Sequence, residues 1–252
     1  SGLFPSASEW PVVTTVPGKE EIMRPNSKLF PRMGELFKAG RSHWQARPDG
    51  DAYAVAGLLK ERLPPDTYDA FGLDSYKFVA IRDLLVSMDA HGMALPWNIT
   101  SPLLERIDRL GGLEVEALLR GGSWHHHLDT SRLATGAQLA EISARLLKTA
   151  DNMEPTLDIY SGHDTTVMPM LIALANNFDG RWPPYASSLV FELYSDQTVR
   201  ILYNEVPVEL AGWPGADYIP LKVLVNIIQM VTPDIAKERL GGEASGVRGD
   251  QF

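Results

Sequence analysis

The spacing of apolar residues predicts a mostly helical chain between about residues 34 and 150. Apolar residues recur three and four positions apart over 78–88, which is the pattern of a helix with one buried face. Asp74 or Ser75 is the expected cap at its start, and Gly92 is the expected stop. We therefore interpret Ala90-His91-Gly92 as the end of a helix and not as a catalytic turn.

Three further helices follow from the same pattern. Ser101-Pro102 places a capping residue before a proline in the first turn, a typical helix start. Residues 131–150 and 220–231 each carry one apolar face. The glycine pairs 111–112 and 121–122 predict breaks between helices.

Strand patterns are shorter and fewer. Residues 188–194 and 198–203 alternate between apolar and polar side chains around the turn 195–197, which predicts a hairpin. The apolar run Leu157–Tyr160 predicts a buried strand, and Val12–Val16 predicts another in the Pro-rich N-terminal stretch.

Composition narrows the functional classes. The net charge of −9 argues against a nucleic-acid-binding surface, which needs clustered Lys and Arg. No apolar run reaches about 18 residues, so we expect no transmembrane segment. The absence of cysteine excludes disulfides, thiolate metal sites and a Cys nucleophile. The compartment stays open, as does glycosylation of Asn98 in the sequon Asn98-Ile99-Thr100.

The first residue adds one expectation about processing. Ser1 is not a start methionine, so we expect that upstream residues have been removed or omitted, although residues 1–20 show no signal-peptide pattern.

The candidate chemistry lies in Gly162-His163-Asp164, between the predicted strand and an apolar helix. Thr165 or Thr166 is the expected cap of that helix, and its N-terminal N–H groups and dipole favour an anion. A phosphate at this point would have one side chain to bind it and another to donate a proton. The alternative is an ordinary turn in which His163 caps the helix and Asp164 satisfies backbone N–H groups.

Two other clusters have plainer interpretations. His125-His126-His127 is expected to be a surface loop, because adjacent imidazoles point in different directions and do not form a metal site. Trp182-Pro183-Pro184-Tyr185 forms either an aromatic pocket wall or a rigid lead into the hairpin, and we favour the second. Glu192, within an apolar strand, is either paired or outward-facing, with Arg200 as a cross-strand partner.

Three ordered motifs carry a resemblance to a known family. They are Tyr160-Ser-Gly-His-Asp-Thr-Thr-Val167, Trp182-Pro-Pro-Tyr-Ala-Ser187 and Phe191-Glu-Leu-Tyr194. Together they resemble the C-terminal part of the histidine acid phosphatases, the branch that includes prostatic-type and lysophosphatidic acid phosphatases. Two weaker similarities, Gly2–Pro5 and His91–Pro96, agree with it.

The resemblance implies an α/β fold, with helices flanking a mixed sheet and a mainly helical cap. It divides the chain into a connecting segment with a core strand (1–33), a helical cap (34–128), the α/β core with the His-Asp motif (129–236) and a flexible tail (237–252). It also implies that His163 binds phosphate and that Asp164 protonates the leaving alcohol, with no metal or other cofactor.

The sequence departs from that family at the nucleophile. The family's nucleophile is a histidine in an Arg-His-Gly-x-Arg motif, and none of the six histidines here follows an arginine. We therefore expect the chain alone to be inactive, because loss of the nucleophile removes the covalent pathway. The missing strands would leave sheet edges exposed, so we expect a cover, either an N-terminal segment of the same protein or another protein.

Two functions remain open at this point. The first is a phosphate monoester hydrolase that acts through a phosphohistidine on the absent segment. The second is a catalytically silent phosphatase fold that serves as a structural or binding subunit of a larger assembly.

Overall fold

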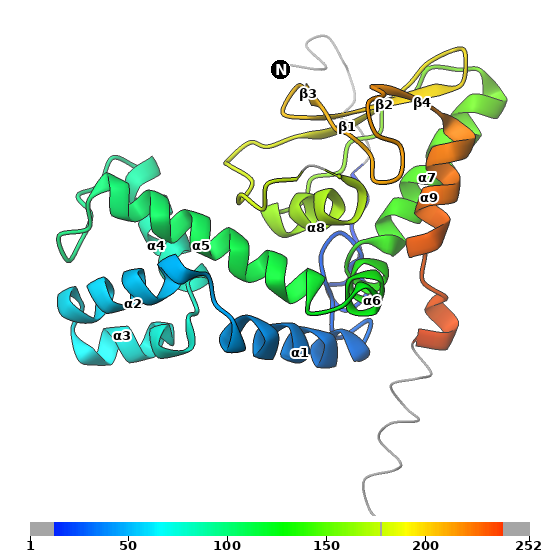
Figure 1. Cartoon of the computed structure of the whole chain (residues 1–252). Coiled ribbons are helices and arrows are strands. Elements are labelled where there is room, and N and C mark those ends of the chain that lie inside the picture. Colours follow the sequence, from blue (N-terminus) through cyan, green and yellow to red (C-terminus); the bar gives the residue numbers. More distant parts are fainter. Residues whose placement is uncertain (1–12, 177, 239–252) are drawn as a thin grey trace, which may run out of the picture.

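The computed structural model describes residues 13–176 and 178–238, in which helices lie below and beside a small sheet (Figure 1). In the first half of the chain, helices form a lobe on the left of the figure. Its elements are α1 (Arg32–Ala46), α2 (Gly50–Arg62), α3 (Pro65–Phe71), the short 3-10 turn η1 (Leu73–Ser75), α4 (Val79–Ala90) and α5 (Ser101–Arg120). A buried apolar cluster between α2, α3, α4 and α5 holds the lobe together.

The second half contains the sheet and the helices packed on it. They are α6 (Trp124–Ala134), α7 (Gly136–Asn152), α8 (Asp164–Leu174), β1 (Leu189–Leu193), β2 (Thr198–Tyr203), β3 (Val206–Pro207), β4 (Tyr218–Pro220) and α9 (Leu221–Val231). A second core lies between α7, α8, α9 and the inner face of the sheet. A third connects the start of α1 with α6, α8 and Trp182. The α/β class expected from the sequence is therefore confirmed.

The sheet is antiparallel throughout the described residues. β2 pairs with β1, β3 and β4. The predicted hairpin is confirmed, with Glu192 opposite Arg200. These two side chains use other partners: the Tyr194 hydroxyl donates to the Glu192 carboxylate at 2.8 Å, and the Arg200 guanidinium lies 5.5 Å from the centre of the Tyr218 ring.

The predicted strand at Leu157–Tyr160 is wrong for the chain as described. The segment is extended without strand pairing among these residues, and Leu157 and Ile159 are 71% and 64% exposed. A strand needs a neighbour for its backbone N–H and C=O groups, so the apolar pattern alone does not create one. The strand expected at Val12–Val16 is also wrong over 13–16, which are exposed and unpaired, while Val12 lies outside the described residues.

Several helix boundaries differ from the predicted ones. α4 is preceded by Phe78, because Asp74 and Ser75 are already taken up by the short 3-10 turn. Its end was predicted correctly, with His91 as C-cap and Gly92 at φ +64°. The run 131–150 is divided between α6 and α7, which meet at Thr135. The tail beyond 238 lies outside the described residues.

The glycine pair 111–112 does not break a helix, contrary to the prediction. α5 runs through both residues, and their lack of side chains serves packing. A Cβ on Gly112 would lie 2.3 Å from the carbonyl oxygen of Gly180, so only glycine allows α5 to approach this loop. By contrast, the pair 121–122 does end the helix, with Gly121 as C-cap at φ +54°.

We expect Gly112→Ala to lower the free energy of unfolding by about 1–3 kcal/mol, because the added methyl group must displace backbone. Gly57→Ala is the matched control, since Gly57 is an exposed residue within α2 and a Cβ there meets nothing within 4 Å. That change should stabilise by about 0.5–1 kcal/mol through helix propensity. Urea unfolding of both variants checks this, and equal effects would contradict the packing role.

An ion pair fixes the start of α2 to α5 in the helical lobe. The Arg106 Nε lies 3.1 Å from both carboxylate oxygens of Asp51, and Arg109 donates to Asp49 at 3.0 Å. The hydrogen bond from Arg106 lowers the pKa of Asp51 below its ordinary value of 3.8. The pair stabilises the fold above that value, and its contribution is lost as the pH falls through the folded-state pKa.

We expect Asp51→Asn to reduce stability at neutral pH by roughly 1 kcal/mol, because both groups are partly exposed and water screens them. The difference from wild type should shrink as the pH falls below about 3.8. Urea unfolding across pH measures it. Glu61→Gln, which changes an exposed carboxylate of the same helix, serves as the control. A difference that does not depend on pH would argue against the ion pair.

Candidate active site

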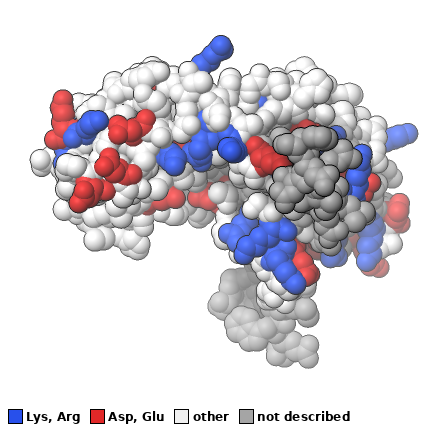
Figure 2. Space-filling view, turned by 90° about the horizontal axis from the view of Figure 1, so that it is seen from below, with Lys and Arg blue, Asp and Glu red and all other residues white. Residues whose placement is uncertain are grey.

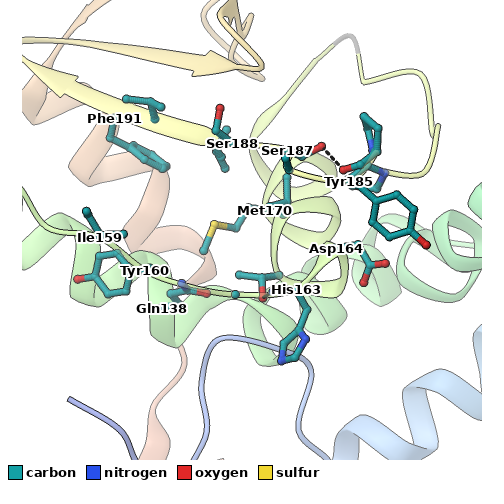
Figure 3. A pocket seen from close by; sticks show the side chains of 18 of the residues that line it. Gln138, Ile159, Tyr160, His163, Asp164, Met170, Tyr185, Ser187, Ser188 and Phe191 are labelled. Atoms are coloured by element: carbon teal, nitrogen blue, oxygen red, sulfur yellow. Dashed lines mark hydrogen bonds between the residues drawn. The ribbon is translucent and has the colours of Figure 1, made fainter. Parts of the chain in front are cut away.

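A cavity of about 1100 Å³ lies between the helical lobe and the sheet. Side chains of α4 and α5 line it on one side, and those of α7 and β1 on another. The extended segment 155–160, the start of α8 and the loop 182–188 complete the wall (Figure 3). Met170 and Phe191 make part of its surface apolar, and His163 and Asp164 lie at its polar end. The predicted site residues therefore face one cavity.

The turn at His163 and Asp164 is held by the first turn of α8. His163 is the N-cap, and its backbone N–H donates to the Thr166 hydroxyl at 2.9 Å. The helix thus begins one residue before Thr165, and neither threonine is its N-cap as predicted. Thr166 still contributes a capping hydrogen bond from the third helical position, because its buried side chain reaches back to the turn.

Asp164 is fixed by two donors, one for each carboxylate oxygen. The Thr165 N–H lies 2.7 Å from Oδ1, and the indole Nε1 of Trp182 lies 2.7 Å from Oδ2. Both are short hydrogen bonds to a charged acceptor, the stronger kind. The side chain remains exposed, so it is held in one orientation while still open to the cavity.

The backbone at this helix start is less available to an anion than the sequence indicated. The N–H groups of His163, Thr165 and Thr166 have partners within the turn: the Thr166 hydroxyl, the Asp164 carboxylate and the His163 carbonyl. Three backbone donors at this helix start are therefore already used within the turn. Figure 3 shows the imidazole pointing away from Met170 and Phe191.

The charged side chains that line the cavity are mostly acidic. Five carboxylates face two guanidinium groups, and they belong to Asp89, Glu105, Asp108, Asp158, Asp164, Arg82 and Arg145. Each arginine is paired: Arg82 Nε donates to Asp108 at 2.7 Å, and Arg145 lies 4.0 Å from Asp158. A phosphate dianion in this cavity would be repelled unless further cations joined it.

The extended segment 155–160 is attached to α7 through its polar side chains. The Tyr160 hydroxyl donates to Glu141 at 3.2 Å, and the Thr149 and Thr156 hydroxyls lie 2.9 Å apart. Burial, followed by the nearby Glu141 carboxylate, raises the pKa of the Tyr160 hydroxyl, which therefore stays protonated and able to donate. These contacts leave Leu157 and Ile159 exposed, although they share one side of an extended chain.

The cluster of three histidines has a different local structure from the predicted one. The three adjacent histidines are not in a loop but in the first turn of α6, where His125 is exposed and His126 and His127 are half-buried. His126 Nε2 lies 3.1 Å from the Leu118 carbonyl, and burial lowers the pKa of His127. No group of three potential metal-ligating side chains occurs within 13–176 and 178–238. No helix among these residues is long and apolar enough to cross a membrane.

Arg82 is the site residue that the sequence analysis missed, and Trp182 was named there for a pocket wall only as the less favoured interpretation. Residues 182–185 line the cavity, so the preference for a purely structural role was wrong. The tryptophan before two prolines was a weak indication that these residues line a pocket. No sequence pattern indicated its hydrogen bond to Asp164. Arg82 carried no signal, because it lies on an ordinary amphipathic helix and reaches the site only through packing.

Comparisons with known proteins support the resemblance seen in the motifs. Residues 129–204 match the histidine phosphatase superfamily (branch 2). Lysosomal acid phosphatase of Rattus norvegicus is 32% identical over 163 residues, which cover 61% of this chain and 37% of that protein. Lysophosphatidic acid phosphatase type 6 of Bos taurus is 26% identical over 247 residues, covering 92% and 53%.

The chain is thus similar to the histidine acid phosphatases. The match to the superfamily includes α8, the His-Asp turn and the β1–β2 hairpin. The chain spans about half or less of the length of these curated relatives.

We expect Thr166→Val to loosen the His-Asp turn of this phosphatase-like site, because it removes the hydroxyl that accepts the His163 N–H. The loss of such a cap costs about 0.5–2 kcal/mol in the free energy of unfolding. Faster exchange of the His163 amide proton, measured by NMR, would locate the effect. Thr166→Ser keeps the hydroxyl and should exchange nearly as wild type does. Equal rates in both variants would contradict the capping role.

Proposed function

We propose that this chain forms the acid-bearing part of a phosphatase that hydrolyses phosphate monoesters through a phosphohistidine. Asp164 is the proton donor and His163 is a phosphate-binding side chain. The observation that carries the proposal is the position of this pair at a cavity wall, with Asp164 fixed by two donors yet exposed. The similarity to histidine acid phosphatases supports the choice of reaction class.

The proposed reaction has two steps. A histidine nitrogen from a segment outside these 252 residues attacks phosphorus, a P–N bond forms and the P–O bond to the alcohol breaks. Asp164 gives its proton to the departing oxygen, which leaves as a neutral alcohol. Water then attacks phosphorus, a P–O bond forms as the P–N bond breaks, Asp164 takes the proton from that water, and inorganic phosphate and the free histidine are released.

The cavity supports the need for a further segment. No histidine in the sequence follows an arginine, and the guanidinium groups that line the cavity are each paired with a carboxylate. A phosphate-binding segment would have to bring cations, because the charged side chains of the described lining are predominantly acidic. The exposed Leu157 and Ile159 offer such a segment an apolar face, beside an extended backbone suited to strand pairing. We propose that this segment is either an N-terminal part of the same protein or another protein chain.

The second candidate is a silent phosphatase fold that acts as a structural or binding subunit. The same exposed segment favours it, because an apolar extended edge binds a partner strand whether or not catalysis follows. The acidic cavity also favours it, since this cavity alone would bind phosphate poorly. The two candidates differ in whether the partner supplies a nucleophilic histidine.

We expect no turnover of an aryl phosphate by the 252-residue chain alone, and turnover by the complete product of its reading frame or by its complex with a nucleophile-bearing partner. In that active form, with an alkyl phosphate as substrate, Asp164→Asn should lower kcat by roughly 10²–10⁴-fold, because general acid catalysis of alcohol departure is lost. Asp179→Asn, at an exposed residue paired with Arg181, is the matched control and should leave kcat unchanged.

The outcomes separate the two candidates. Acid-labile phosphorylation of a histidine during turnover would support the hydrolase. A complete protein with no turnover and no phosphohistidine would reject it and favour the binding subunit. Turnover by the isolated chain would contradict the proposed need for a second segment.

A further inference from the structure

The indole of Trp182 is placed to control the orientation of Asp164. Its Nε1 donates to Oδ2 of Asp164 at 2.7 Å, while the opposite carboxylate oxygen accepts the N–H of Thr165. The indole is a rigid donor, and Trp182 is only 6% exposed, so the donor cannot follow a moving carboxylate. Two fixed donors on the two oxygens leave the carboxyl group one favoured plane.

The indole is itself held by helices α4 and α5 of the helical lobe, which is the cap that the family resemblance predicts. The Arg82 guanidinium lies 4.5 Å from the centre of the Trp182 ring, a cation–π contact. Arg82 comes from α4, its side chain is 8% exposed, and Nε donates to Asp108 of α5 at 2.7 Å. The absent side chain of Gly112 brings the Trp182 backbone against α5. The cap therefore reaches Asp164 through Arg82 and Trp182.

We propose that Trp182 is the positioning residue for the proton donor, and that through it the Arg82-bearing cap sets the angle at which Asp164 meets the leaving group. The inference rests on the proposed function, because it gives Asp164 the role of acid. It means that the cap influences proton transfer to the leaving group. Trp182 acts through Asp164 and does not itself exchange a proton with substrate.

The contact can be tested in the isolated chain, without turnover. The chain has six tryptophans, and the indole N–H signal that disappears in Trp182→Phe identifies Trp182 in an NMR spectrum. That signal should shift with pH as Asp164 titrates, and it should be stationary in Asp164→Asn. The second variant also excludes Asp83 and Asp108, the carboxylates bonded to the Arg82 that lies over the ring, as the source of the shift. A signal that ignores pH in wild type, or that still shifts in the variant, would overturn the inference.

The consequence for catalysis is tested in the active form defined above. Trp182→Phe keeps the ring and removes the donor, so it should lower kcat for an alkyl phosphate by roughly tenfold, since hydrogen bonds to charged groups are the strong ones. With an aryl phosphate the alcohol departs without much help from an acid, and kcat should change little. KM for both substrates should stay near wild type, because the cavity wall is kept.

Trp44→Phe is the matched control. Trp44 is 5% exposed, and its Nε1 donates to the Tyr76 carbonyl at 2.8 Å, within the cap and away from Asp164. This variant loses an equally buried donor, yet its ratio of alkyl to aryl turnover should equal that of wild type. An equal loss for both substrates in Trp182→Phe, or the same ratio change in Trp44→Phe, would show a merely structural role and reject the inference. A complete protein without phosphatase activity would instead reject the proposed function, and the NMR result would still stand.

Discussion

The close approach of α5 to the loop at 180–182 is the constraint that places the helical lobe against the site. Gly112 permits it, because any side chain there would meet the Gly180 carbonyl. Once the helix and the loop are in contact, Arg82 lies over the Trp182 ring, and the ring's N–H reaches Asp164. The geometry of the candidate acid thus follows from a backbone contact in a region without catalytic groups of its own.

In the exposed segment 155–160, an apolar sequence pattern that is typical of a buried strand lies at the surface. Leu157 and Ile159 are more than half exposed, whereas burial of an aliphatic side chain contributes about 1.5–3 kcal/mol. Polar contacts to α7 hold the segment in place, but they do not bury its apolar side chains. The sequence of this segment is suited to a sheet that the described residues do not form, and an incoming strand would supply both backbone partners and burial.

Helix and hairpin positions were largely readable from the sequence, because both depend on local periodicity and local turn residues. The hairpin at 195–197 and the end of α4 at Gly92 are of this kind. Predictions failed where a residue's role depended on something distant. Gly111 and Gly112 are a residue pair typical of a helix break, but they serve the close packing of α5. The segment Leu157–Tyr160 has the apolar pattern of a strand, but no strand pairs with it among the described residues. The prediction for the histidines at 125–127 failed for a local reason, because Ser123 caps a helix that begins at Trp124.

The sequence by itself placed His163 and Asp164 beside the start of a helix, and it indicated a resemblance to a family. Those properties are local, since they depend on consecutive residues and on their order along the chain. Only the tertiary structure decided that Trp182 orients Asp164, that Arg82 from α4 holds Trp182, and that the charged side chains lining the cavity are mostly acidic. These features join residues from 82 to 182, and no spacing along the sequence encodes a contact that arises when separate helices and loops pack together.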